Sequence, residues 1–116
     1  MKFGEMGEAL ACQELERRGY SIIARRYRQK RGELDIIARD GPTLVFVEVK
    51  ARGGRAFGEG AEAVTPLKRR RMTRIADEYI ARNRLGPCPC RFDVVSIRLD
   101  DSGPRIEVYQ NAFDRA

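Results

Sequence analysis

Two apolar runs separated by a short turn, residues 32–39 and 43–51, constrain the fold of this chain more than any other part of its sequence. Both runs are rich in isoleucine, valine, leucine and phenylalanine, and the turn between them contains Gly41 and Pro42. Apolar strands joined by such a turn are typical of a β-hairpin. We therefore expect two neighbouring antiparallel strands here.

The second run is apolar on both of its faces until it reaches Glu48. Side chains alternate along a strand, so Val45 and Val47 lie on one face while Leu44 and Phe46 lie on the other. A strand that is apolar on both sides belongs in a sheet covered on both faces. The charged residues that follow are then at one end of a largely buried strand, where a charge is costly unless it is paired or bound to a metal.

The hairpin register decides which acids of the two strands meet. Glu33 and Asp35 share one face of the first strand. A two-residue loop places Glu33 opposite Glu48, whereas a four-residue loop places Asp35 opposite Glu48. Pro42 cannot donate a ladder hydrogen bond, which favours the longer loop. Carboxylates directly opposed across a ladder repel each other, so this pair needs a cation.

Two interpretations of these charges stay open. In one, an ion pair between a buried acid and a lysine merely staples the hairpin. In the other, Asp35 and Glu48 hold a hard divalent cation, Mg²⁺ in the first place with Mn²⁺ as a substitute, together with substrate phosphate oxygens. Lys50 would then project beside the metal, where it orients a water molecule or stabilises negative charge in the transition state.

A helix is expected over residues 3–18, because Gly19 occupies the position after its end and Arg17 and Arg18 suit the helix dipole there. Glu8 lies on the same face of this helix as three apolar residues, Ala11, Cys12 and Leu15. Glu8 therefore either completes a metal site from the helix or lies at the helix edge and reaches solvent.

A second helix is predicted from Thr65, as N-cap, and Pro66 to about Arg84. Its buried stripe consists of Met72, Ile75, Ala76, Tyr79 and Ile80. Its first half is basic, with Lys68, Arg69, Arg70, Arg71 and Arg74. A solvated face is the default for such a run, but cations near a helix N-terminus oppose the dipole, and a phosphate partner would relieve that conflict.

Three further strands are expected over residues 20–28, 91–99 and 105–109, with a turn over residues 100–104. The glycine-rich stretch from Arg52 to Gly60 predicts a mobile loop beside the acids, either a connector or a carrier of substrate contacts. At 116 residues, the chain is expected to form a single domain.

Composition excludes several classes of chemistry. The chain has no histidine, which removes every mechanism that needs imidazole. Its three cysteines form no disulfide framework, so we expect a reduced, cytoplasmic setting, and the pair Cys88 and Cys90 has too few companions for a zinc site. No apolar run has the length of a membrane span. The formal net charge of +6 favours a polyanion as partner.

The spacing of the acids resembles a known nuclease pattern. Asp35, then Glu48, Val49 and Lys50 on the following strand, with Glu8 on a preceding helix, resembles the PD-(D/E)xK superfamily, whose fold is restriction-endonuclease-like. The whole chain is similar to the small bacterial YraN-like family, a distant relative of archaeal Holliday junction resolvases. The segments that carry this similarity are residues 7–8, 32–35, 46–50 and 111–113.

The resemblance implies an α/β, restriction-endonuclease-like fold with a central mixed β-sheet flanked by helices, and a Mg²⁺-dependent endonuclease acting on branched DNA. It implies that Glu8, Asp35 and Glu48 are metal ligands and that Lys50 is the catalytic lysine. Because resolvases cut two symmetric strands, it also implies a homodimer.

Residues expected to contact nucleic acid are Arg28, Arg52, Lys68, Arg69 and Arg70. Two competing hypotheses stay open beside the nuclease. One is a binding module that keeps the fold without turnover, and whose salt-sensitive binding does not depend on Asp35. The other is a purely structural protein with an ion-paired hairpin, which predicts no salt-sensitive DNA binding.

Overall fold

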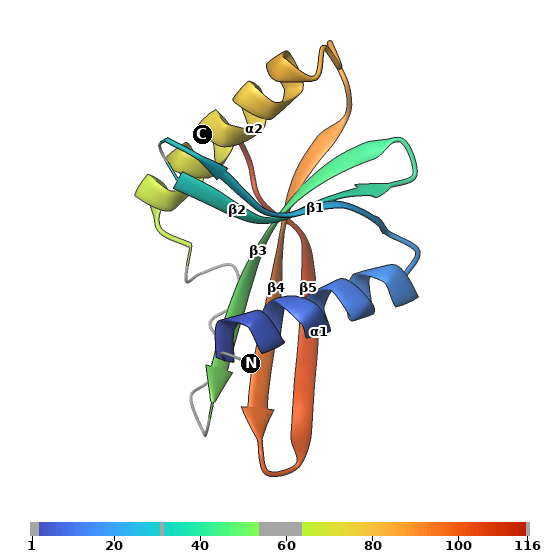
Figure 1. Cartoon of the computed structure of the whole chain (residues 1–116), viewed down its shortest axis with the longest axis vertical. Coiled ribbons are helices and arrows are strands. Elements are labelled where there is room, and N and C mark those ends of the chain that lie inside the picture. Colours follow the sequence, from blue (N-terminus) through green and yellow to red (C-terminus); the bar gives the residue numbers. More distant parts are fainter. Residues whose placement is uncertain (1–2, 31, 54–63, 116) are drawn as a thin grey trace.

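A mixed β-sheet with one helix on each face forms the frame of the protein (Figure 1). The computed structural model describes residues 3–30, 32–53 and 64–115. The elements are α1 (Phe3–Arg17), β1 (Ser21–Gln29), β2 (Gly32–Asp40), β3 (Thr43–Gly53), α2 (Pro66–Arg82), β4 (Cys90–Asp100) and β5 (Gly103–Phe113). The predicted α/β fold with a central mixed sheet is thus confirmed, and it is compatible with a restriction-endonuclease-like fold.

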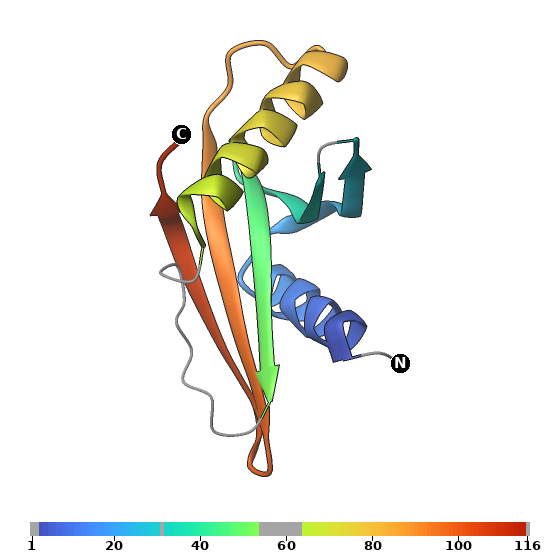
Figure 2. The same cartoon turned by 90° about the vertical axis from the view of Figure 1, so that its left-hand side faces the viewer.

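The five strands lie in sequence order, β1-β2-β3-β4-β5. Only β3 and β4 are parallel, since α2 connects them, and the other neighbours are antiparallel. Figure 2 shows α1 and α2 on different sides of the long strands β3, β4 and β5. No helix in the described part of the chain is both long and apolar enough to cross a membrane.

Both faces of the sheet are buried, as the pattern of the second apolar run predicts. Leu44 and Phe46 of β3 belong to the core under α2, whereas Val45 and Val47 belong to the core under α1. The residues of α2 in the first core include Met72, Ile75 and Ala76, and those of α1 in the second are Ala11, Cys12 and Leu15. The central strand therefore anchors both layers of the molecule.

The β2–β3 hairpin has the register that Pro42 favours. Asp40 pairs with Thr43, and the ladder continues as far as Ile36 opposite Val47. The turn itself is shorter than the expected four-residue loop, because Asp40 and Thr43 still pair across it. The register is nevertheless the one that brings Asp35 level with Glu48.

Helix α1 lies very close to β3 at Gly7. A Cβ atom on Gly7 would lie 2.7 Å from the Cβ of Ala51, which is closer than such atoms approach. Glycine is needed here because the helix backbone packs directly on the strand. The next residue in α1 is Glu8, so this close approach sets how near its carboxylate comes to the hairpin.

The ends of β4 and β5 differ from the prediction. The turn is limited to residues 101–102, because Ser102 donates its backbone N–H (2.9 Å) and its hydroxyl (2.5 Å) to Asp100 Oδ1 and Asp100 pairs with Gly103. β5 therefore begins earlier than predicted, and Pro104 is tolerated because β5 is an edge strand. The predicted glycine-rich loop lies, beyond Gly53, outside the described residues.

Candidate functional site

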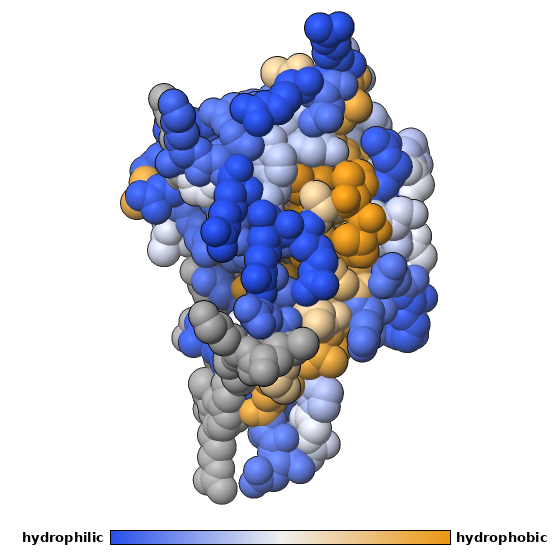
Figure 3. Space-filling model, viewed as in Figure 1, coloured by the Kyte–Doolittle hydropathy of each residue, from blue (hydrophilic) through white to orange (hydrophobic). Residues whose placement is uncertain are grey.

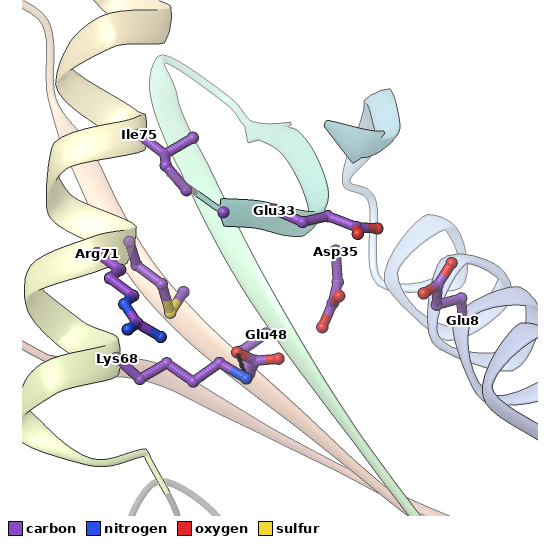
Figure 4. Close-up of a pocket in the computed structure, with 9 residues that line it drawn as sticks. Glu8, Glu33, Asp35, Glu48, Lys68, Arg71 and Ile75 are labelled. Atoms are coloured by element: carbon purple, nitrogen blue, oxygen red, sulfur yellow. Dashed lines mark ion pairs between the residues drawn. The ribbon is translucent and has the colours of Figure 1, made fainter. Parts of the chain in front are cut away.

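A cavity of about 460 Å³ opens between β2, β3 and the two helices (Figure 4). Its walls come from α1, the start of β2, β3 and the first turns of α2. The residues that line it are Glu8, Gly32, Glu33, Asp35, Glu48, Lys68, Arg71, Met72 and Ile75. Four carboxylates and two cations therefore meet in one hollow of the surface.

The cavity exists because β2 leaves β3 just before the acids. Backbone pairing between the two strands ends at Ile36 and Val47. Beyond that point the side chain of Asp35 replaces the missing partner: its Oδ2 accepts a hydrogen bond of 2.8 Å from the backbone N–H of Val49. This bond fixes the Asp35 carboxylate beside β3, next to Glu48.

Three of the carboxylates can bind one ion together. One oxygen atom from each of Glu8, Glu33 and Asp35 lies within 4.8 Å of the other two. Figure 4 shows Asp35 projecting between Glu8, which comes from α1, and Glu48 on β3. Oxygen ligands of this kind suit hard cations such as Mg²⁺ and Mn²⁺ rather than soft metals.

Asp35 is the most perturbed acid of the group. Burial, together with the hydrogen bond and the negative charge of Glu48, raises the pKa of Asp35 from 3.8 to about 7. The N–H of Val49 and the charge of Lys68 act in the opposite direction and do not compensate. Without a metal, Asp35 is therefore still protonated in a substantial fraction of the molecules near neutral pH.

Glu8 is held by an arginine of β1. Its Oε1 accepts a hydrogen bond of 2.7 Å from Arg26 Nε, and its side chain is only 14% exposed. Arg26 itself has a φ of 52°, a left-handed conformation that is rare for arginine. Of the two alternatives for Glu8, the structure favours the buried face over the solvent-exposed helix edge.

Glu48 is paired with a lysine from α2, not from its own strand. Lys68 Nζ lies 2.7 Å from Glu48 Oε2, and the Glu48 side chain is only 7% exposed. Arg71, one turn further along α2, also lines the cavity. The buried acid–lysine pair that the sequence left open thus exists, but it joins the helix to the sheet and does not staple the hairpin.

The predicted catalytic residues are only partly brought together. Glu8, Asp35 and Glu48 all line the cavity, whereas Lys50 is not among the described residues that do so. Lys50 is half-buried and lies level with Ser96 of the neighbouring strand β4. Glu33 was not predicted as part of the site, although its position two residues before Asp35 was a usable signal.

Lys68 and Arg69, both predicted to contact nucleic acid, make close contacts within the protein. Lys68 is bound to Glu48, as described above. Arg69 donates from its Nε to the carbonyl oxygen of Val64 at 3.1 Å, and its guanidinium lies 5.5 Å from the ring centre of Phe113. Arg69 therefore fastens the start of α2 to β5, which gives it a structural task.

The remaining three predicted contacts are not among the described residues that line the cavity. Arg28 is 75% exposed and lies 3.4 Å from Glu33. Arg70 is exposed on α2, and Arg52 is half-buried near the end of β3. In Figure 3, hydrophilic side chains dominate the part of this face that α2 and the tip of β1 and β2 occupy.

Comparisons with known proteins give a consistent result. The model of the uncharacterised protein family UPF0102 matches residues 7–97. A UPF0102 protein of Symbiobacterium thermophilum is 50% identical over 113 residues, which cover 97% of this chain and 96% of that protein. A UPF0102 protein of Geotalea uraniireducens is 47% identical over 114 residues, covering 97% and 90%.

A more distant relative, a UPF0102 protein of Pseudomonas aeruginosa, is 41% identical over 114 residues, covering 96% of this chain and 91% of that protein. The matched region runs from Gly7 in α1 to Ile97 in β4, so it includes every residue that lines the cavity. The predicted relationship to the YraN-like family is confirmed, and this chain belongs to the uncharacterised protein family UPF0102.

Proposed function

We propose that this protein is a metal-dependent endonuclease that hydrolyses phosphodiester bonds in DNA. One observation carries the proposal: Glu8, Glu33 and Asp35 bring carboxylate oxygens within 4.8 Å of one another in a cavity that also contains Glu48. Among them, Asp35 is half-buried beside Glu48 and makes no ion pair with a described residue, so its ionisation destabilises the protein unless a cation enters. Basic residues on α2 and β1 surround the cavity, so an anionic substrate fits the surroundings.

The donor set fits a hard divalent cation. Glu8, Asp35 and Glu48 would hold it, and Glu33 is close enough to the first two to take part. Mg²⁺ is the expected ion and Mn²⁺ a substitute, because both prefer carboxylate oxygens and water as ligands. When bound, such an ion polarises the phosphoryl oxygen and lowers the pKa of a water molecule.

The reaction is a hydrolysis. A water oxygen forms a new bond to phosphorus, one phosphoester bond breaks, and the departing oxygen takes up a proton. The carboxylates of Asp35 and Glu48 orient the attacking water and accept its proton, while Lys50 is assigned the stabilisation of the added negative charge. The backbone N–H of Val49 holds Asp35 in place during these steps.

The class of substrate follows from charge and from the resemblance to resolvases. The chain carries a formal net charge of +6, and Lys68 and Arg71 of α2 line the cavity. We propose branched or otherwise structured DNA, such as a Holliday junction, as the substrate and a homodimer as the acting form. The three cysteines are free thiols, which supports a cytoplasmic location.

The test is cleavage of a labelled four-way junction beside a linear duplex of matched sequence. Each is incubated with Mg²⁺, with Mn²⁺ or with a chelator, and with the wild type, Asp35→Asn or Lys50→Ala. We expect metal-dependent cutting by the wild type and a loss of at least about 100-fold in each variant, with DNA binding retained.

Equal cutting by the wild type and both variants would overturn the proposal, since the activity would then come from elsewhere. Salt-sensitive binding without cutting would instead favour the non-catalytic binding module. That outcome is checked by asking whether binding is independent of metal and of Asp35. A preference for the junction over the duplex would support the proposed substrate.

A further inference from the structure

The ion pair between Lys68 and Glu48 places a cation on a carboxylate that the proposed function reserves for a metal. Lys68 Nζ is 2.7 Å from Glu48 Oε2, which is a short, charge-assisted contact. Glu48 is almost fully buried while the Lys68 side chain is 41% exposed. The acid is therefore fixed within the sheet, and the lysine reaches it from the solvent side.

Resting on the proposed function, we infer that Lys68 is the resident counter-cation of this site. In the metal-free protein it neutralises Glu48, and a divalent cation that enters must displace it from that carboxylate. Two cations at contact distance from one carboxylate repel each other. Metal entry is therefore an exchange of one cation for another at Glu48.

The position of Lys68 in α2 allows this exchange without disturbing the helix. Its backbone N–H donates to Oγ1 of the N-cap Thr65 at 3.2 Å, so the main chain is fixed independently of the side chain. The lysine side chain is long and has many rotamers. Its ammonium can leave Glu48 while the first turn of α2 stays in place.

The displaced ammonium has a second task. Lys68 lines the same cavity as the acids, and Arg71 lines it from the next turn of α2 (Figure 4). A substrate phosphate entering the cavity would therefore meet two cations from α2. Lys68 then contacts a phosphate oxygen in place of Glu48, in addition to the role proposed for Lys50.

The first measurement is metal affinity without DNA, using Lys68→Met. Methionine keeps most of the stem of the side chain and removes the charge. Arg71→Met is the matched control, because Arg71 is a cation of the same cavity that makes no ion pair with any described residue. Binding of Mn²⁺ and Mg²⁺ is followed by titration calorimetry at pH 8, where protons compete less for the acids.

We expect Lys68→Met to bind the metal about tenfold or more tightly than the wild type, and Arg71→Met to differ from it by less than about threefold. The control measures the general effect of removing one positive charge. Equal or weaker binding by Lys68→Met would overturn the inference. So would an equal gain in both variants, because the direct contact with Glu48 would then have no special effect.

The second measurement follows the lysine itself. The chain has only four lysines, Lys2, Lys30, Lys50 and Lys68, so protein labelled with ¹³C at the lysine ε-carbon gives a spectrum that single variants can assign. We expect Mg²⁺ to shift the Lys68 signal towards that of an exposed lysine as the site fills. Circular dichroism of Lys68→Met checks that the variant is folded.

The outcomes separate the two proposals. Saturable Mg²⁺ binding with an unchanged Lys68 signal would contradict the role of Lys68 as counter-cation, but it would support the proposed metal site. Absence of metal binding in the wild type and in Lys68→Met alike would overturn both. Binding that appears only in Lys68→Met would support the inference, since it would show that the lysine blocks the site.

Discussion

Two buried aspartates of this protein have opposite environments. Asp93 of β4 is fully buried, and both of its oxygens are used: Tyr20 donates at 2.8 Å, Arg91 at 2.9 and 3.1 Å, and the N–H of Asn111 at 2.9 Å. It lies inside the strand, three residues after its start. Its charge is thus satisfied by the fold alone.

Asp35 of β2 has a much poorer environment. One backbone N–H, from Val49, donates to it, and it lies beside the carboxyl group of Glu48 with further acids, Glu8 and Glu33, within 4.8 Å. Its pKa is raised to about 7 as a result, chiefly by burial. Both residues are aspartates close to the centre of the sheet, so the difference lies in what surrounds them.

The comparison distinguishes a carboxylate that stabilises the fold from a carboxylate that needs a ligand to compensate its charge. A buried carboxylate with four donors stabilises the arrangement of the strands around it. A buried carboxylate facing another acid costs stability, and such a cost is retained most often where function needs it. The following predictions test this distinction, beginning with the largest expected effect.

Asp93→Ala should be the most damaging substitution. It leaves the Tyr20 hydroxyl and the backbone N–H of Asn111 without their acceptor, and it leaves the Arg91 guanidinium with Asp40 as its only carboxylate among the described residues; together these losses should cost about 3 kcal/mol. Urea denaturation measures the loss of the free energy of unfolding. Asp100→Ala, which removes an exposed turn carboxylate, is the control and should lower the free energy of unfolding far less. Similar losses in both variants would remove the contrast on which the comparison rests.

Asp35→Asn should have the opposite effect and raise the free energy of unfolding. Because the pKa of Asp35 is raised in the folded state, folding favours the protonated form, so stability falls as pH rises from about 4 to about 7 and is lowest above that. Asparagine removes the charge and can still accept from Val49. At pH 8 without metal, we expect a gain on the order of 2 kcal/mol.

Denaturation at pH 4.5 and pH 8 checks this prediction. Ionisation of Asp35 should lower the free energy of unfolding of the wild type between pH 4.5 and pH 8. The variant should not show this contribution to the pH dependence. A variant less stable than the wild type at pH 8 would show that the Asp35 carboxylate is a structural group like Asp93.

Much of the fold could be predicted from the sequence because its signals are local. The N-cap Thr65 and Pro66 start α2 where the pattern indicates, and Thr65 Oγ1 accepts the expected bond. The strand order could not be predicted, since nothing local specifies that β3 pairs with β4 in parallel. The length of β5 was missed because Gly103 and Pro104 imitate a turn.

The site was predictable to the extent that it depends on the hairpin. Pro42 indicated the register that brings Asp35 level with Glu48. The pairing of Lys68 with Glu48 was not predictable, because it depends on how α2 crosses the sheet. Sequence spacing places residues along an element, whereas this contact depends on how elements pack against each other.

A divalent cation should remove the cost that Asp35 imposes. At pH 8, Mg²⁺ at about ten times its dissociation constant should stabilise the wild type by about 1.4 kcal/mol, because it binds only the folded protein. The midpoint of thermal unfolding with and without Mg²⁺ measures this. Asp35→Asn should gain less than half as much stability. Buffer that contains chelator and no divalent cation sets the baseline. An equal gain in the variant would place the metal away from these acids.

Arg26→Asn should have the smallest effect on stability, and it decides where Glu8 belongs in the comparison. Glu8 has an arginine partner, as Asp93 does, and faces the cavity, as Asp35 does. Asparagine tolerates the left-handed backbone at this position, so the change removes the ion pair with little added strain.

The ion pair is partly exposed, with 37% of the Arg26 side chain in solvent, so its loss should lower the free energy of unfolding only slightly. Urea denaturation at pH 8 measures the change. A cost near that of Asp93→Ala would mean that Glu8 is a structural acid held by its arginine. A small cost, combined with altered Mg²⁺ affinity, would group Glu8 with Asp35, as a carboxylate whose arginine partner orients it towards the ion.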